Sequence, residues 1–233
     1  MTHQQDRTAP LRRRTLLRGA LLTGATAITG THLTSCSAPA AEHSTEPTRQ
    51  STATAPDGRG VLLAYFSRRG ENYYYGRRTD LATGNTEVLA GTISRLITCE
   101  VYRIEAAEPY PDSYDQTVQR NVREQDADAR PAIAGRLPSL DRYDTILLGS
   151  PIWNVRPPMI MKTFAEALDF HGRTVVPFTT HVMSRLGTVE RDYTASCTGA
   201  TLAQGLAVRG EEVTKAQAEV QAWLRRLGIG PVT

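Results

Sequence analysis

The stretch that decides the fold is GVLLAYFSRRGENYYYGRRTDLATGNTEVLAGTISRLI, residues 60–97. It begins with an unbroken apolar run at 60–66, which is typical of a β-strand covered on both faces. It ends at 85–97 with apolar residues spaced as on one face of a helix, which Asn85 or Thr86 can cap. A strand, a loop and a helix in this order predict the first unit of an α/β protein.

Strands and helices alternate along the rest of the chain. The sequence predicts further strands at 99–105, 143–153, 173–180 and 205–210, and further helices at 114–128, 157–168, 193–202 and 211–228. Five strands in alternation with five helices predict an α/β fold with a doubly wound five-stranded parallel sheet. The usual strand order is 2-1-3-4-5, and ligands bind where the order reverses, outside the carboxyl ends of the first and third strands.

The loop after the first strand has features of a phosphate site. Ser67, Asn72, Asn85 and Thr86 offer small polar groups, and the start of the helix near Asn85 offers free N–H groups. Arg68 is the best candidate for a charged contact. Each has a plainer alternative, because Ser67 can simply end a strand and Asn85 and Thr86 can simply cap a helix.

The loops after the third and fourth strands suit a planar ring. Trp153 stands between Pro151 and Pro157, and the fourth strand ends in Thr180 and His181. A tryptophan in this place can also belong to the core, whereas Trp223 in the last helix reads as core packing. One loop for a phosphate and two for a ring suggest a mononucleotide such as FMN.

At this point the chain resembles the flavodoxin-like family. The resemblance covers about residues 60–228 and is carried by AYFSRRGENY, TGNTEVLA, ILLGSPIWNVRPPMIMKTFAEALDFHGRTVVPFTT and GATLAQGLAVRG. It implies FMN held without a covalent bond. The phosphate would be held by residues on the first loop and helix start, namely Ser67, Arg68, Asn72, Gly84, Asn85 and Thr86. The ring would lie between the third loop and the fourth, at Pro151, Ile152, Trp153, Asn154, Thr180 and His181.

One departure from the short family pattern lies in the first loop, because Gly84 follows Gly70 only after fourteen positions. The residues 73–83 form an excursion that phosphate binding does not require. Its three tyrosines, Tyr73, Tyr74 and Tyr75, can shield the ligand, cover neighbouring backbone or meet another subunit. The sequence leaves these alternatives open.

Residues 1–36 are typical of an export signal. Arg13 and Arg14 precede an uncharged run at 19–33, as in twin-arginine signals, and Leu33 to Cys36 resemble a lipoprotein cleavage box. The resemblance implies that Cys36 becomes lipidated and anchors the protein to the outer face of the cell membrane. Residues 37–58 are rich in Ser, Thr, Ala and Pro and predict a disordered linker, which leaves 59–230 as the flavodoxin-like domain.

Charge argues against a nucleic-acid partner. The whole chain carries a net charge of +3, but residues 1–36 hold five arginines and one aspartate, which leaves 22 of the 27 basic and 23 of the 24 acidic residues for the remainder. The body of the protein is therefore close to neutral. Cys99 and Cys197 allow one disulfide outside the cytoplasm, but the sequence does not show that they lie within reach.

The sequence lacks the motifs of several other classes. Its histidines and cysteines do not have metal-ligand spacing, and the GxGxxG fingerprint of dinucleotide domains is absent. The resemblance to the flavodoxin-like family, together with the export-signal pattern, implies an FMN-binding electron-transfer protein on an exported lipoprotein, with an unknown redox partner protein or small acceptor. Two alternatives remain: an NAD(P)H-dependent quinone or flavin reductase, and a flavin-free binding or scaffold lipoprotein.

Overall fold

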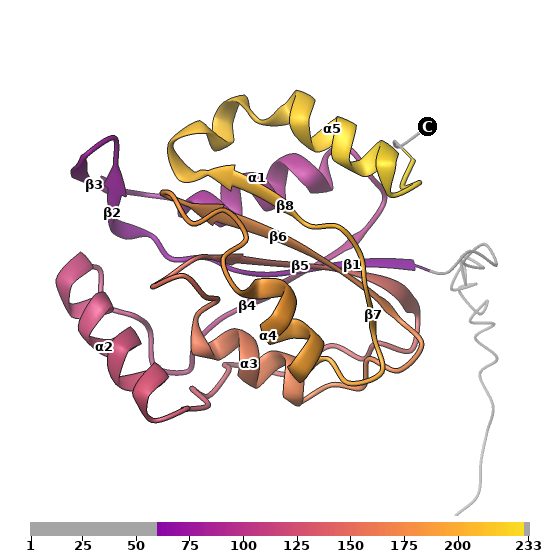
Figure 1. Cartoon of the computed structure of the whole chain (residues 1–233), viewed down its shortest axis with the longest axis horizontal. Coiled ribbons are helices and arrows are strands. Elements are labelled where there is room, and N and C mark those ends of the chain that lie inside the picture. Colours follow the sequence, from indigo (N-terminus) through magenta and orange to yellow (C-terminus); the bar gives the residue numbers. More distant parts are fainter. Residues whose placement is uncertain (1–59, 231–233) are drawn as a thin grey trace, which may run out of the picture. The chain divides into compact units, whose positions relative to one another are not determined.

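The computed structural model describes residues 60–230, and Figure 1 shows a parallel sheet between two layers of helices. The sheet has the order β4-β1-β5-β6, with β7 and β8 both paired to β6. Its strands are β1 (Gly60–Phe66), β4 (Glu100–Ile104), β5 (Tyr143–Pro151), β6 (Thr174–His181), β7 (Thr201–Leu202) and β8 (Leu206–Arg209). With β7 and β8 taken together as the fifth strand, the predicted fold and the order 2-1-3-4-5 are confirmed.

Helices cover both faces of the sheet (Figure 1). On one face lie α1 (Asn85–Ser94), the 3₁₀ helix η1 (Gly210–Lys215) and α5 (Gln217–Arg226); on the other lie α3 (Met159–Glu166) and α4 (Val189–Ser196). The remaining helix, α2 (Tyr114–Asp126), contacts α3 and the first strand of a separate hairpin. Within residues 60–230, no helix has both the length and the apolar character that a membrane span needs.

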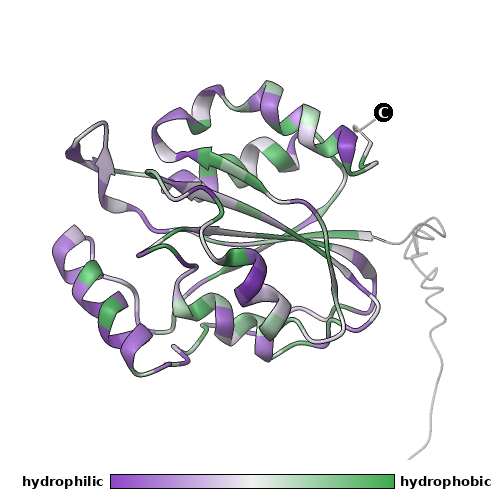
Figure 2. Ribbon diagram, in the orientation of Figure 1, coloured by the Kyte–Doolittle hydropathy of each residue, from purple (hydrophilic) through white to green (hydrophobic). Residues whose placement is uncertain are grey.

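The core is divided between the two faces because side chains alternate along each strand. Leu62 and Leu148 pack against α3 and α4, whereas Leu63 and Leu147 pack against α1 and α5. All four leucines are fully buried, and each such burial contributes about 1.5–3 kcal/mol relative to exposure. Figure 2 shows apolar colour along much of the central strands of the sheet. Trp223 is fully buried in the α1–α5 layer, as predicted.

The fifth strand is broken into two pieces. In β6, Val175 pairs with β7 and Phe178 pairs with β8, so Pro177 lies at the break. Proline has no amide hydrogen to donate to a ladder, which accounts for the gap in pairing beside it. The carboxyl half of β6 is thereby joined to β8, and His181 is brought opposite Arg209.

The segment after β1 differs from the predicted loop. Residues 70–81 form an antiparallel hairpin of β2 (Gly70–Tyr74) and β3 (Arg77–Leu81). Tyr75 and Gly76 make its two-residue turn, both with positive φ. Most of the excursion at 73–83 therefore lies in an ordered antiparallel ribbon.

Two predicted helices also need correction. The helix predicted at 193–202 begins earlier, at Val189, and residues 201–202 belong to the sheet. The helix predicted at 211–228 begins as η1 and becomes an α-helix only at Gln217. The predicted export signal, the linker and Cys36 lie outside the described residues.

Candidate functional site

A cavity of about 360 Å³ lies at the carboxyl ends of β1, β5 and β6. This is the position that the strand order predicts, because β1 and β5 are the strands on either side of the switch point. Eleven of the twelve predicted cofactor residues line it: Ser67, Arg68, Asn72, Asn85, Thr86, Pro151, Ile152, Trp153, Asn154, Thr180 and His181. Such a volume suits one small organic ligand.

Gly84, the twelfth residue, lies behind the cavity wall and determines its shape. A Cβ atom at this position would lie 2.3 Å from Ser67 Oγ and 2.4 Å from the carbonyl oxygen of Arg68. Any larger residue would therefore push α1 away from the end of β1. Glycine lets the helix start directly beside the loop after β1.

The N-terminus of α1 opens onto this cavity. Its N-cap position has no side-chain cap of its own, and Ser67 Oγ accepts instead from the amide of Glu87 at 3.1 Å. Within the described part of the chain, the amides of Asn85 and Thr86 have no acceptor. The positive end of a helix with open N–H groups and a nearby serine hydroxyl is a general anion-binding arrangement.

A hydroxyl pair joins the helix to the sheet. Thr86 Oγ1 and Thr180 Oγ1 lie 2.7 Å apart, and both side chains are buried. Thr86 belongs to the first turn of α1, and Thr180 to the carboxyl end of β6. This bond fixes the distance between the helix start and the loop after β6, the two sides of the cavity.

Arg68 is held by backbone rather than left free for a ligand. Its Nη1 donates to the carbonyl oxygens of Pro111 at 2.9 Å and Asp112 at 3.0 Å, and its Nη2 donates to that of Glu71. Burial lowers the pKa of Arg68, and Asp112 opposes this shift. Of the three side-chain nitrogens of Arg68, only Nε has no hydrogen-bond partner among the described residues. The guanidinium therefore mainly fastens the first loop to the segment before α2.

Trp153 stands in an aromatic cluster at the edge of the cavity. Its ring meets Phe66 edge-on at 5.7 Å and Tyr110 at 5.1 Å between centroids. The backbone turns sharply after it, with positive φ at Asn154 and Val155. The tryptophan both packs against the core and forms part of the cavity wall. The two roles that the sequence offered as alternatives, core residue and ring neighbour, are therefore compatible.

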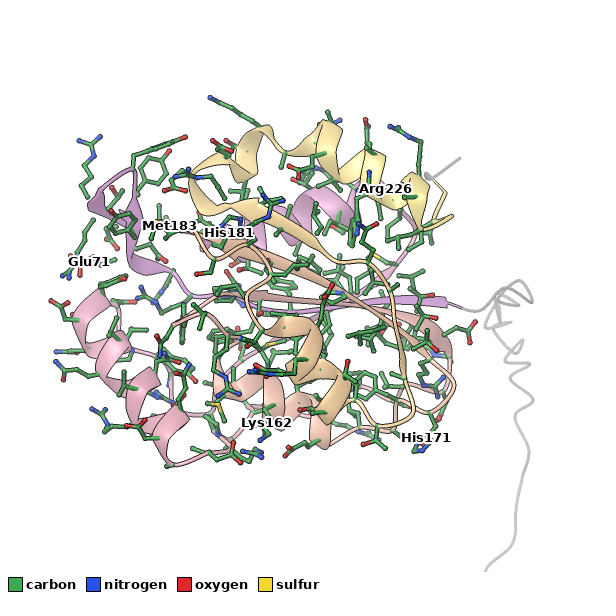
Figure 3. The ribbon with its side chains drawn as sticks, viewed as in Figure 1. Glu71, Lys162, His171, His181, Met183 and Arg226 are labelled. Carbon is green, nitrogen blue, oxygen red and sulfur yellow. The ribbon has the colours of Figure 1, made fainter. Side chains whose placement is uncertain are left out.

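His181 is a buried histidine beside positive charge. It is 8% exposed, and its Nδ1 has no hydrogen-bond partner among the residues that the structure describes. Burial lowers its pKa, as do Arg185 and Arg209. The ring is therefore neutral near pH 7. Figure 3 places His181 with the exposed Met183 at the end of the molecule that carries Glu71.

Helix α2 supplies a wall that the sequence analysis missed. Tyr114, Thr117, Val118, Asn121 and Val122 line the cavity, and both valines are more than 40% exposed. The available signal was a pair of valines one turn apart on an otherwise polar helix, which marks an apolar stripe.

Glu211 is a second wall residue that the sequence analysis missed. It is 6% exposed and accepts from the amide of Tyr75 at 3.3 Å. Burial raises its pKa, but hydrogen bonds from its own amide and that of Tyr75, together with Arg209, lower it overall. Glu211 therefore remains ionised at neutral pH and links the hairpin to η1.

Two further features concern cysteine and metal chemistry. Cys197 packs on the α3–α4 side of the sheet and Cys99 on the α1–α5 side, and both are free. The disulfide that the sequence left open is therefore not formed. Residues 60–230 contain no group of three His, Cys, Asp or Glu side chains placed to hold a metal ion.

Comparison with known proteins agrees with this architecture. The sequence model of the flavodoxin family matches residues 79–227, which begin within β3. A candidate flavoprotein from Bacteroides uniformis ATCC 8492 is 30% identical, with a TM-score of 0.59, over 72% of this chain and 99% of that one. A candidate flavoprotein from Bacteroides eggerthii DSM 20697 is 26% identical, with a TM-score of 0.59, over 73% and 98%. No protein with a curated description matches the chain.

The sheet order and the crevice at its switch point define the class of doubly wound, flavodoxin-like α/β proteins. More than half of the chain lies within the matched residues, and the chain belongs to the flavodoxin family.

Proposed function

We propose that this protein binds FMN and transfers electrons. The observation that carries the proposal is that one cavity combines an open helix N-terminus with an apolar and aromatic wall. A flavin mononucleotide has the matching parts, a terminal phosphate and a planar ring. Bound FMN supplies the redox chemistry, because its ring accepts and donates electrons, and the protein supplies binding and orientation.

The phosphate end fits the start of α1. The amides of Asn85 and Thr86 and the hydroxyl of Ser67 are donors grouped at the positive end of one helix. A phosphate there would occupy N–H groups that have no acceptor among residues 60–230. Arg68 contributes at most through Nε, since its other nitrogens already donate to carbonyl oxygens.

The ring end fits the loops after β5 and β6. Ile152 and Trp153 line the cavity from the loop after β5, and His181 and Val182 line it from the end of β6 and the residue after it. The two valines of α2 line a third side. These side chains exclude water from a bound ring. Neutral His181 can hold a polar edge of the ring without adding a positive charge beside it.

Exposed apolar side chains surround the mouth of the cavity, which supports electron exchange with a partner protein or small acceptor at this place. Of the large hydrophobic residues that are exposed in residues 60–230, all but Val101 lie on the cavity wall or next to it: Tyr73, Tyr75, Val118, Val122, Val155 and Met183. Apolar patches of this kind mark contact sites on otherwise polar surfaces.

The test is the visible spectrum of the purified full chain, followed by titration with FMN and riboflavin. We expect flavin absorption bands or one equivalent of FMN bound, and tighter binding of FMN than of riboflavin. Ser67→Ala should weaken FMN binding at least about tenfold, because a hydroxyl donor to phosphate is lost. The matched control is Ser139→Ala, an exposed serine away from the cavity. A protein without flavin bands that does not bind FMN would overturn this proposal and favour the flavin-free binding or scaffold alternative.

A reductase that uses NAD(P)H is the second candidate. Arg185 and Arg209 both act on His181 electrostatically, so two guanidinium groups lie near the ring end of the cavity, of which Arg209 also contacts the Glu211 carboxylate at 3.5 Å. Such charge suits the phosphates of a nicotinamide dinucleotide. Turnover of NADPH with a quinone by the FMN-loaded protein would favour this candidate, and the lack of turnover would leave a carrier.

We also propose that residues 1–36 direct export and that lipidated Cys36 anchors the domain at the outer face of the cell membrane, with residues 37–58 as the linker to the domain at 59–230. The support is the order of the arginine pair, the apolar run and the cysteine in the sequence. Cys36→Ser should release the protein from the membrane fraction, and Cys99→Ser should not. Membrane association of Cys36→Ser would overturn the anchor.

A further inference from the structure

The hairpin β2–β3 is fixed at its base beside the phosphate end of the cavity. Gly70 opens it with a φ of +82°, and a Cβ there would lie 2.8 Å from the backbone of Asp112. The amide of Glu71 donates to the carbonyl oxygen of Asp112 at 2.8 Å. Gly70 and Leu81 then face each other across the two strands. The ribbon therefore rises directly from the loop that holds Ser67.

One side of the hairpin is tied to the start of α2. Arg78 donates to both carboxylate oxygens of Asp115, at 2.8 and 2.6 Å, and lies 4.6 Å from the ring centre of Tyr114. Glu71 accepts from the amide of Tyr114 at 2.9 Å. A two-pronged arginine–carboxylate contact of this kind fixes direction as well as distance.

The tip of the hairpin reaches the opposite side of the cavity. The amide of Tyr75 donates to Glu211, which follows Gly210 at the start of η1. Gly210 in turn lies against the first residue of α1, because a Cβ on it would be 2.5 Å from Asn85 Nδ2. The ribbon thus spans from α2 to the segment that touches the helix start, and Asn72 and Tyr73 line the cavity between.

We propose that this hairpin ends the binding site just beyond the phosphate and makes the site selective for a flavin mononucleotide over a flavin dinucleotide. The inference rests on the proposed FMN function. In FMN the phosphate is the last group, so a closed end accommodates it. In FAD the same phosphate carries an adenylate, which must leave the cavity through the space between the helix start and the ribbon. The hairpin, held at α2 and at Glu211, occupies that path.

The experiment compares FMN and FAD binding to the full chain by quenching of flavin fluorescence. The main variant replaces residues 73–78 with Asn-Gly, which keeps Asn72 and Thr79 opposite each other as in the present register. Asn-Gly is the preferred two-residue turn between antiparallel strands. We expect the ratio of FMN to FAD affinity to fall at least about tenfold, through tighter FAD binding.

A second variant covers the case in which the shortened hairpin does not fold. The double substitution Arg78→Ala and Glu211→Ala removes the ion pair with Asp115 and the contact with the Tyr75 amide, and it keeps the full-length ribbon and the bond between Glu71 and the Tyr114 amide. The ratio of FMN to FAD affinity in this variant should fall in the same direction as in the main variant. Arg130→Ala is the matched control, because it removes an arginine–carboxylate pair with Glu166 away from the cavity. Its ratio should equal that of the unchanged protein.

The outcomes separate the two proposals. If the unchanged protein binds neither flavin, the FMN function fails. If it binds FMN and FAD equally, or if a folded variant keeps the original ratio, FMN binding stands and the role of the hairpin is overturned.

Discussion

The hydroxyl groups of Thr86 and Thr180 lie 2.7 Å apart although the residues are 94 positions apart in the sequence. One residue belongs to the first helix and the other to the fourth strand of the sheet order, so their bond closes the site from two independent elements. Both groups are almost fully buried, which makes each the principal partner of the other.

This bond should appear in stability measurements. Thr180→Val leaves the Thr86 hydroxyl buried without its partner, and the loss in free energy of unfolding should be about 1–3 kcal/mol. The double substitution Thr86→Val and Thr180→Val should cost less than the sum of the two single substitutions, because neither orphan remains. Urea denaturation of the four proteins measures this coupling, and strictly additive losses would contradict it.

Two glycines of α1, Gly84 at its N-cap and Gly91 in its interior, should respond oppositely to alanine. Gly84→Ala places a methyl group within 2.4 Å of two neighbouring atoms and should destabilise the fold by about 1–3 kcal/mol, with weaker flavin binding. In Gly91→Ala the new Cβ would lie 3.4 Å from its nearest neighbour, the flexible end of Arg95. The higher helix propensity of alanine should therefore increase the free energy of unfolding by roughly 0.5–1 kcal/mol. Thermal or urea unfolding of both variants, together with FMN titration, checks the contrast. Equal effects would argue against the close approach at Gly84.

Acid should weaken the fold partly through His181. Its pKa in the folded protein is lowered by burial and by Arg185 and Arg209, so below about pH 6.5 the unfolded chain takes up a proton that the folded chain refuses. Stability is therefore lost as the pH falls from 7 towards 5. His181→Asn should lose less stability over this interval, as measured by urea denaturation at both pH values. An unchanged pH dependence would show that His181 is protonated equally in both states.

Cys99 and Cys197 should react with thiol reagents at different rates. Burial raises the pKa of the Cys197 thiol to about 12, and burial also raises that of the half-buried Cys99. In a Cys36→Ser background, we expect slow reaction at Cys99, negligible reaction at Cys197 in the native protein, and two free thiols in denaturant. A count of zero in denaturant without reductant would indicate the disulfide that the structure lacks.

The sequence predicted the sheet well because its signal is strong and local. Residues 60–66 were predicted as a strand and form β1 with the same bounds. Long apolar runs between amphipathic helices pack stably only as the inner strands of a parallel sheet, and that topology then places the crevice. Most of the predicted residues line this crevice for the same reason.

The hairpin and the role of Arg68 were not predictable in the same way. A two-stranded ribbon is marginal alone, and this one depends on Asp112, Asp115 and Glu211, which lie far away in sequence. A local cue existed in Tyr75-Gly76, since glycine favours the second place of a tight turn. For Arg68 no cue existed, because its carbonyl partners at 111 and 112 are 43 and 44 positions away.

The broken fifth strand also affects how this sheet meets its surroundings. At one edge, β7 has only two residues and β8 only four, and they pair with the parts of β6 before and after Pro177. At the other edge, β4 carries Glu100 and Arg103 among its five residues. Edges that are short, interrupted or charged are poor templates for a strand from another molecule. Edge-to-edge joining of the sheets of two such domains is therefore disfavoured.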